Sequence, residues 1–325
     1  MKKTLALMCA LFLVISALSS CSGEKIAKDK KIVCTMFPQY DWVMEILGEK
    51  AEEWDVSILM QTGTDLHSFE PTAEDIIIID QSDLFIHVGG ESDGWVDDVL
   101  SQVEYDKTVI NMLEVLGDEA ILSEHEHEHE HEHDHEDEAA EGEEHEHNDE
   151  HVWLSLHNAE LLCDVICDSV CAIDKDNADF YRSNYQNYAN KIDELDHEYH
   201  ETVENSKHTK LLFADRFPFV YMCENYGIEY YAAFSGCSTE SRADSETING
   251  LITKLDEWEL GCVCVLEGSD QEIAKTVISG SHNKDRDIIV FNSLQSVTVV
   301  DIEKGADYLE LMQYNLDALN QALNM

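Results

Sequence analysis

The chain of 325 residues has few prolines and few basic side chains. It contains 3 prolines, and 20 Lys and Arg stand against 69 Asp and Glu, for a formal net charge of −49. Because phosphates and anionic lipids repel such a surface, nucleic acid and anionic membranes are excluded as favoured partners. The sequence also lacks a CxxC pair, so it offers no signature of a structural zinc knot.

The N-terminus is the one long apolar segment of the chain. Lys2 and Lys3 precede an apolar stretch, 5–18, that is too short to span a bilayer as a stable anchor. The sequence Leu-Ser-Ser-Cys that ends at Cys21 resembles a bacterial lipobox. We therefore expect residues 1–20 to be a lipoprotein signal peptide, and Cys21 to carry lipid that holds the protein outside the cytoplasm on the bacterial cell membrane.

A run of alternating histidine and acid occupies residues 124–150. Its residues include no apolar side chain larger than alanine, so we expect a disordered, solvated loop. Neutral imidazole is a common ligand of zinc, copper and nickel, which favours an accessory metal-capture loop over a merely solubilising acidic linker. Its histidines are His125, His127, His129, His131, His133, His135, His145 and His147.

Short apolar runs alternate with stretches of helical period, once before this loop and once after residue 208. This alternation predicts βαβ units and two α/β lobes with parallel sheets. The predicted strands are 31–36, 55–60, 83–88, 108–111, 210–214, 229–234, 261–267 and 287–291. The predicted helices are 40–48, 72–81, 158–173, 179–206, 246–257 and 271–279.

The longest predicted helix joins the two series. Residues 179–206 contain neither glycine nor proline, and 28 residues at ~1.5 Å each would extend roughly 42 Å. A rigid connection of this length permits little hinge motion, so a ligand would lie in a cleft between lobes that move only slightly. We expect a tether at 21–30, a first lobe at 31–173, the linking helix at 174–207 and a second lobe at 208–325.

The mature cysteines divide into a helical group and a scattered group. Cys163, Cys167 and Cys171 are spaced four apart, which predicts one helix face, and a buried stripe is favoured over a thiolate site. An exported protein permits disulfides, but spacing alone leaves their connectivity open. The cysteines whose pairing stays open are Cys223, Cys237, Cys262 and Cys264.

The first segment with metal-binding character is G-T-D-L-H-S-F-E-P-T, residues 63–72. It follows a predicted strand and precedes a helix for which Thr72 is the expected N-cap. Loops at the carboxyl ends of parallel strands are where α/β folds place ligands, so His67 is a candidate to present its imidazole to a cleft. A lone loop histidine is more often a surface residue.

The second segment is D-E-H-V-W-L-S-L-H-N-A, residues 149–159. His151 closes the histidine-rich run and opens an apolar, aromatic stretch, so it should be held rigidly. His157 lies one residue before the predicted helix and is interpreted as a surface or capping residue.

Together these two segments resemble the two histidine motifs of zinc-specific solute-binding proteins of ABC transporters, the cluster A-I type. Members of that family also carry a His/acid-rich loop immediately before the second motif. Further matching segments are 37–42, 226–228, 235–238 and 305–309, so the resemblance extends over essentially the whole mature chain. It implies a two-lobed α/β receptor with a long linking helix, metal between the lobes and delivery to a membrane permease. It also implies a monomer that is not an enzyme.

The resemblance transfers His67 and His151 directly as metal ligands. The family's third histidine has no counterpart, and its position is occupied by Ala214. Its last ligand position, after the final strand, reads Asn292, a poor zinc ligand.

Because zinc prefers four ligands, the second lobe should supply a further one. Asp215 and Glu267 each lie at the end of a predicted strand, and their oxygens suit zinc. The structural alternative for each is an ordinary one: Asp215 paired with Arg216 or a lysine, and Glu267 capping the helix that starts near Asp270.

Zn²⁺ import is therefore the leading functional interpretation, with three alternatives. A Mn²⁺ or Fe²⁺ receptor of the same family would combine two histidines with carboxylates, but a loop rich in imidazole favours zinc over manganese. A zinc hydrolase, from another class, would need an open coordination position, a general base and a substrate pocket. A metal-buffering or cell-adhesion lipoprotein without a transport role is the last alternative.

Overall fold

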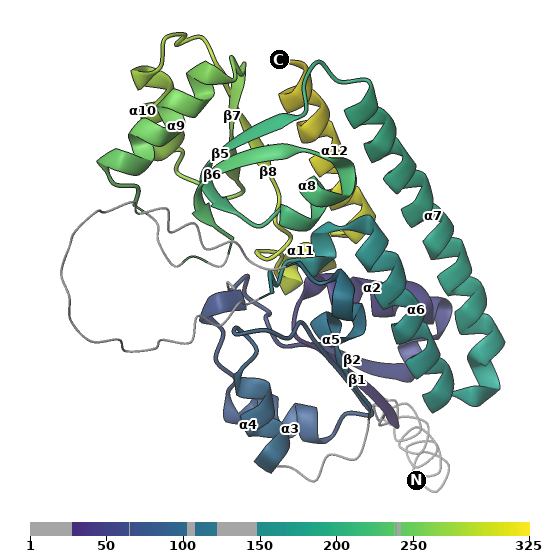
Figure 1. Cartoon of the computed structure of the whole chain (residues 1–325). Helices are drawn as coiled ribbons and strands as arrows, with labels where there is room; N and C mark the ends of the chain where they lie inside the picture. The colour runs from purple at the N-terminus through teal and green to yellow at the C-terminus, as the bar shows by residue number, and fades with distance from the viewer. Residues whose placement is uncertain (1–27, 65, 103–107, 122–147, 237, 239–241) are drawn as a thin grey trace, which may run out of the picture.

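The structure is a computed structural model that describes residues 28–64, 66–102, 108–121, 148–236, 238 and 242–325. The predictions for the signal peptide, for Cys21, for the eight histidines of 125–147 and for Cys237 lie outside these residues. Figure 1 shows two lobes, each built around one sheet, with long helices along one side of the molecule.

The first lobe is built on a four-stranded parallel sheet with the order β2-β1-β3-β4. Its strands are β1 (Lys30–Cys34), β2 (Trp54–Ile58), β3 (Leu84–His87) and β4 (Thr108–Asn111). Its helices are α2 (Phe37–Leu47), α3 (Ala73–Asp80), α4 (Trp95–Gln102) and α5 (Met112–Leu116), with short 3₁₀ turns at Gly48–Glu53, Leu66–Ser68, Gly117–Glu119 and Val152–Leu154.

The second lobe repeats this plan with the order β6-β5-β7-β8, again all parallel. Its strands are β5 (Lys210–Phe217), β6 (Glu229–Ser235), β7 (Cys262–Leu266) and β8 (Asp287–Phe291). Its helices are α8 (Val220–Tyr226), α9 (Ser245–Glu257), α10 (Glu272–Gly280), α11 (Val299–Glu303) and α12 (Tyr308–Asn324). The predicted class, two α/β lobes with parallel sheets, is thereby confirmed.

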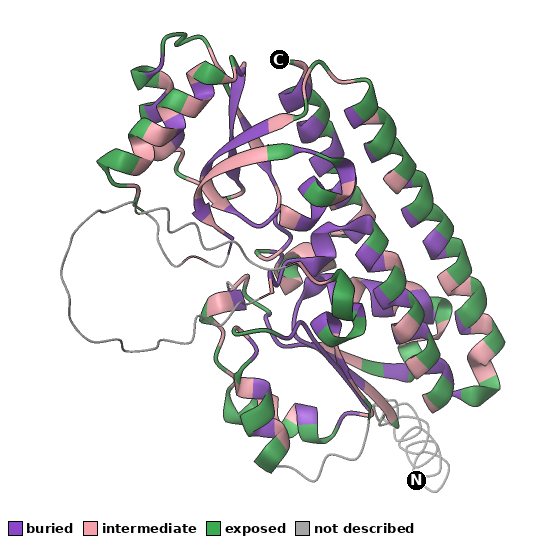
Figure 2. Ribbon diagram, viewed as in Figure 1, coloured by how far each residue is buried: buried purple, intermediate pink, exposed green. Residues whose placement is uncertain are grey.

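Helices α6 (Leu156–Ile173) and α7 (Ala178–Glu204) connect the lobes through a 3₁₀ turn at Lys175–Asn177. Helix α7 has 27 residues and extends along both lobes, with α12 beside it (Figure 1). Its exposed and buried faces alternate with the helical period, as Figure 2 shows, because its apolar residues pack on α2, α6 and α12. Among the described residues, none of the helices has both the length and the apolar character needed to cross a bilayer.

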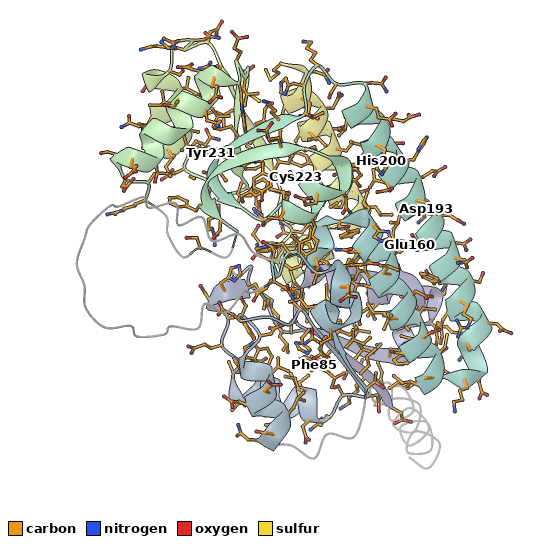
Figure 3. The ribbon with its side chains drawn as sticks, in the orientation of Figure 1. Phe85, Glu160, Asp193, His200, Cys223 and Tyr231 are labelled. Atoms are coloured by element: carbon orange, nitrogen blue, oxygen red, sulfur yellow. The ribbon has the colours of Figure 1, made fainter. Side chains whose placement is uncertain are left out.

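The cysteines serve as small apolar residues of the core. Cys163, Cys167 and Cys171 are buried along α6, which confirms the predicted stripe. Cys223 of α8 lies inside the second lobe (Figure 3), and the thiols among the described residues are unpaired. Burial raises the pKa of the Cys223 thiol well above its ordinary value, so it is held protonated and unreactive.

One predicted strand is too short. The expected strand 210–214 continues to Phe217, because the pairing of β5 with β6 shifts register between Phe213 and Arg216. This irregularity places two polar residues, Asp215 and Arg216, inside the strand and interrupts the apolar pattern by which a strand is recognised in a sequence. Asp215 therefore lies within β5 instead of following it.

Candidate metal centre

His151 is held in one orientation by the residue two positions before it. Its Nδ1 lies 2.9 Å from Asp149 Oδ1, and the same oxygen accepts the His151 backbone N–H at 2.9 Å. Because a carboxylate oxygen accepts, Nδ1 carries the proton and Nε2 carries the lone pair. The ring is fully buried, and Nε2 has no hydrogen-bond partner among the described residues. A buried imidazole nitrogen in this state is suited to a metal ion.

His67 stands on the 3₁₀ turn Leu66–Ser68, in the loop between β2 and α3. Its Nδ1 lies 2.6 Å from Ser92 Oγ and 3.4 Å from Glu150 Oε2. The following helix begins as predicted, since the Thr72 hydroxyl accepts the Asp75 backbone N–H as an N-cap. The loop is thereby held at His67 itself and at Thr72, where α3 begins.

The rings of His67 and His151 face one another. Their centroids are 5.5 Å apart and their planes meet at 62°. With Zn–N bonds of about 2.0–2.1 Å and tetrahedral angles, two imidazoles on one zinc ion would have centroids roughly 5 Å apart. The observed pair has the spacing of two ligands of a single ion.

A cavity of about 530 Å³ opens beside His67 between the two lobes. The first lobe contributes Gly63, His67 and Ser68, and the remaining lining comes from the second lobe. The second-lobe residues that carry charge into this cavity are Asp215, Arg216, Glu267 and Asp270. Of the four predicted ligands, His67, Asp215 and Glu267 line this cavity, whereas His151 does not. Ala214 lines the same cavity without a donor atom of its own.

Asp215 accepts two backbone amides. Its Oδ1 accepts the Arg216 N–H at 2.9 Å, and its Oδ2 accepts the Leu266 N–H at 3.3 Å. Its carboxylate therefore joins β5 to the end of β7 at the cavity wall. To bind a metal ion it would have to exchange at least one of these bonds.

Glu267, directly after β7, is bonded to the loop that follows β8. Its Oε2 accepts the Ser293 N–H at 2.8 Å, while Oε1 accepts the hydroxyls of Ser293 at 2.6 Å and Ser296 at 2.9 Å. It does not cap α10, whose N-cap is Gln271. Asn292 accepts the Leu294 N–H at 2.8 Å and so serves its own loop.

The loop after β8 also contacts the segments that carry both histidines. Thr62 and Thr298 form an antiparallel bridge, and Trp153 Nε1 donates to the Ser293 carbonyl at 2.9 Å. Gly63 packs so closely that a Cβ there would lie 2.7 Å from the Ser296 carbonyl oxygen. Glu267 therefore stabilises a loop on which the two lobes meet.

The described residues hold no ready cluster of three metal-binding side chains. No three of their His, Cys, Asp and Glu side chains converge closely enough to hold one ion. The arrangement is a pair of imidazoles, of which His67 lines a cavity whose second-lobe side carries carboxylates and His151 is buried 5.5 Å from His67.

Sequence reasoning missed the residues that hold the histidines in place. The segment 124–150 was expected to be solvated to its end, but Asp149 and Glu150 are 1% and 2% exposed. They are buried because they bond to the two histidines and to Ser92, whose backbone N–H donates to Glu150 Oε1 at 2.9 Å. Burial raises the pKa of Glu150, while the hydrogen bonds from Ser92 and the neighbouring His151 oppose that rise.

Ser92 is presented by the loop between β3 and α4, which folds around Asp93. Asp93 Oδ2 accepts the N–H groups of Val88 at 2.8 Å and Gly89 at 2.9 Å. Gly90 has φ +78°, and a Cβ there would lie 2.4 Å from Glu150 Oε1, so glycine is required on two grounds. The segment G-G-E-S-D-G after a buried strand was the signal that could have identified this loop.

His157 lies outside the centre, as expected. Its side chain is 58% exposed on α6, and its Nε2 lies 3.5 Å from the Glu119 carboxylate. It provides an exposed first-lobe histidine for comparison with the buried pair.

Comparison with known proteins matches residues 32–322 to the family described as "Zinc-uptake complex component A periplasmic" (ZnuA). The chain is 31% identical over 318 residues to the zinc-binding lipoprotein AdcA of Streptococcus pneumoniae, covering 98% of this chain and 60% of that protein. It is 28% identical to the high-affinity zinc uptake system protein ZnuA of Bacillus subtilis, covering 97% of this chain and 95% of that protein. The chain thus spans about 60% of the length of its AdcA relatives.

Solved structures show the same architecture. The Zn(II)-bound ZnuA-like domain of Streptococcus pneumoniae AdcA matches with a TM-score of 0.70 at 25% identity, over 91% of this chain and 100% of that one. The periplasmic zinc-binding protein TroA of Treponema pallidum matches in fold with a TM-score of 0.73 at 20% identity, over 91% of this chain and 100% of that one.

Proposed function

The chain belongs to the ZnuA family of zinc-uptake components, and from this premise we propose that it captures Zn²⁺ between its two lobes and delivers it to an ABC import permease. Proteins of this family are solute-binding receptors and not enzymes. In this proposal the ion is cargo, which must be bound tightly outside the cell and then released to the partner in the membrane.

One observation carries the proposal: two imidazoles stand 5.5 Å apart, and one of them, His67, lines a cavity between the lobes. His151 Nε2 is buried with no hydrogen-bond partner among the described residues, which is costly for a polar atom unless a ligand engages it. We assign His67 and His151 as the first two ligands. Both belong to the first lobe, so that lobe would receive the ion first.

For the rest of the coordination sphere we propose carboxylate oxygen from Glu267 or Asp215, with water in any position left over. Both side chains line the cavity opposite His67. A small approach of the lobes, accompanied by exchange of a serine or backbone hydrogen bond for a metal bond, would complete a site of four ligands.

Zinc is favoured over manganese as the cargo. Imidazole ligands suit zinc, and affinities for a given nitrogen site rise from manganese to zinc in the divalent series. The relatives named above are described as zinc-binding proteins or are zinc-bound in their structures.

The remaining parts of the proposal concern export, membrane anchoring and metal capture by segments outside the two lobes. We propose that residues 1–20 are a signal peptide, that lipid on Cys21 and a tether at 21–30 hold a monomer at the membrane, and that 124–147 gathers zinc. The lobes would be 31–173 and 208–325, joined by 174–207. The relative AdcA of Streptococcus pneumoniae is itself described as a lipoprotein, which supports the anchor.

Competitive zinc titration tests the proposal. The protein used would begin at Ser22, which removes the lipid site and retains all residues that the structure describes. It would be compared with His67→Ala, with His157→Ala and with a deletion of 125–147. One tight zinc site should survive both the deletion and His157→Ala but be lost in His67→Ala. Loss of all tight binding with the deletion alone would refute a receptor site between the lobes.

A further inference from the structure

Two neighbouring carboxylates, Asp149 and Glu150, lie on opposite sides of the centre and each reaches a different histidine. Asp149 Oδ1 is 2.9 Å from His151 Nδ1, and Glu150 Oε2 is 3.4 Å from His67 Nδ1. Both carboxylates are almost completely buried. Burying two carboxylates side by side costs free energy, and we infer that this cost is tolerated because both carboxylates contact the histidines.

The contact at His67 also involves Ser92. The Ser92 hydroxyl lies 2.6 Å from His67 Nδ1, and the Ser92 backbone N–H donates to Glu150 Oε1 at 2.9 Å. The Glu150 carboxylate oxygen 3.4 Å from His67 Nδ1 favours a proton on that nitrogen, and the Ser92 oxygen can accept it. We therefore assign the proton of the neutral His67 ring to Nδ1.

The backbone keeps both carboxylates in place. The Asp149 backbone N–H donates to the Ile121 carbonyl at 2.8 Å, and the Asp149 carbonyl accepts the Tyr221 hydroxyl at 2.8 Å. Glu150 is held by the Ser92 backbone N–H and packs against Gly90, which leaves no room for a Cβ. The orientation of each histidine therefore depends on tertiary contacts that exist before any ion arrives.

Resting on the proposed function, we propose that Asp149 and Glu150 are positioning residues that set both imidazoles to the Nδ1–H tautomer, in which Nε2 is the nitrogen that can bind a metal ion. Asp149 acts on His151 directly, and Glu150 acts on His67 together with Ser92. The two ligands then need no proton loss at Nε2 and little ring rotation when zinc binds. Such preorganisation typically changes metal affinity by about 10–100-fold.

The test determines the tautomers of His67 and His151 in the metal-free protein by NMR. Long-range ¹⁵N–¹H spectra of chelator-treated protein beginning at Ser22, labelled at histidine, distinguish Nδ1–H from Nε2–H rings. Comparison with His67→Gln and His151→Gln assigns the two signals. Both histidines should be Nδ1–H in the wild type.

The isosteric variants should then act separately. Asp149→Asn should disturb the tautomer of His151 and leave that of His67, whereas Glu150→Gln and Ser92→Ala should do the reverse. Zinc affinity should fall about 10–100-fold in each. The matched control is Glu119→Gln, which removes an exposed carboxylate next to the exposed His157 and should change neither reading.

Two results would overturn the positioning role. One is a wild-type protein in which either histidine is Nε2–H before metal is added. The other is zinc affinity in Asp149→Asn and Glu150→Gln equal to that of the Glu119→Gln control. Failure of the proposed function looks different, since His67→Gln and His151→Gln would then bind zinc as tightly as the wild type, while the metal-free tautomers would still decide the positioning role.

Discussion

The two walls of the cavity are prepared in opposite ways. On the first-lobe side, the imidazoles of His67, which lines the cavity, and of His151, buried beside it, are held through Nδ1, and His151 Nε2 is buried with no hydrogen-bond partner among the described residues. On the second-lobe wall, Asp215 and Glu267 accept two and three hydrogen bonds from their own lobe. One wall is ready for an ion, and the other must give up bonds to bind it.

Physical chemistry explains the difference. A neutral imidazole can be buried with one nitrogen waiting at moderate cost, whereas a carboxylate without a cation must be satisfied by hydrogen bonds. The second-lobe carboxylates are therefore engaged when no ion is bound. This division lets the first lobe receive the metal and the second lobe respond to it, which suits a receptor that must later release its cargo.

The largest expected effect comes from removing a histidine on the prepared wall. His151→Gln should weaken zinc binding at least roughly a thousandfold, about 4 kcal/mol, because a buried ligand with no substitute nearby is lost. His157→Gln, on the exposed face of α6, should leave the affinity unchanged. Competition against a chelator of known affinity measures both, and comparable losses in the two variants would remove the distinction between the walls.

A smaller effect is expected on the responding wall. Of Glu267→Gln and Asp215→Asn, the variant that alters the coordinating carboxylate should reduce zinc affinity by tens of fold, since it weakens a metal bond that replaces an existing hydrogen bond. The amide oxygens can still accept from Ser293 and from the Leu266 backbone, so thermal unfolding should change little. If either variant matched His151→Gln in its loss, the second-lobe wall would be as decisive as the first.

A substitution at Gly90, which packs against Glu150, should also weaken zinc binding by the first lobe. Gly90→Ala places a Cβ 2.4 Å from Glu150 Oε1 in a backbone with φ +78°, whereas Gly117→Ala meets nothing within 4 Å at φ +51°. Both variants carry the strain of a positive φ, about 1 kcal/mol, but only the first displaces Glu150. We expect Gly90→Ala to lose zinc affinity several-fold and Gly117→Ala to lose only stability, as titration and thermal unfolding would show. Equal affinities would separate Glu150 from metal binding.

The last effect is on stability and not on zinc affinity, and it concerns the contact between α2 and α12. Burial and the charge of Asp307 raise the pKa of Asp41 to about 7, against an ordinary value near 4, although the Tyr308 N–H donates to it at 3.1 Å. The folded state therefore binds a proton that the unfolded state releases, and stability falls as pH rises from about 4 to about 7.

Asp41→Asn should remove this penalty while keeping an oxygen for the Tyr308 N–H. We expect it to stabilise the protein by about 1–3 kcal/mol at pH 8 and by almost nothing at pH 4, measured by denaturant unfolding. Asp55→Asn, at an exposed position of β2, serves as the control. Destabilisation of Asp41→Asn at pH 8 would contradict the assigned cause.

Much of the fold could be predicted from the sequence because apolar runs and helical periods are local signals. Strands β4 and β8 occupy the predicted residues, and the helix predicted for 179–206 is α7 (Ala178–Glu204). The predicted end of β5 was wrong, because the register shift between Phe213 and Arg216 depends on the partner strand β6.

The site was only partly predictable for the same reason. His67 and His151 stood in recognisable motifs, but the contact of Glu150 with Ser92 joins residues 58 apart in the chain. An acidic residue at the end of an acidic run has the local pattern of a solvated one. The hydrogen bonds to Glu267 likewise come from the loop after β8. Glu267 could therefore be identified from the sequence as a candidate ligand, but its hydrogen-bond partners could not.

Anomalous diffraction at the zinc edge, from crystals of the zinc-loaded protein, would locate the ion relative to the two histidines. We predict one strong peak about 2.0–2.1 Å from the Nε2 atoms of both His67 and His151, with carboxylate oxygen of the second lobe or water completing the coordination sphere. A zinc-loaded crystal with no peak between these two histidines would contradict it.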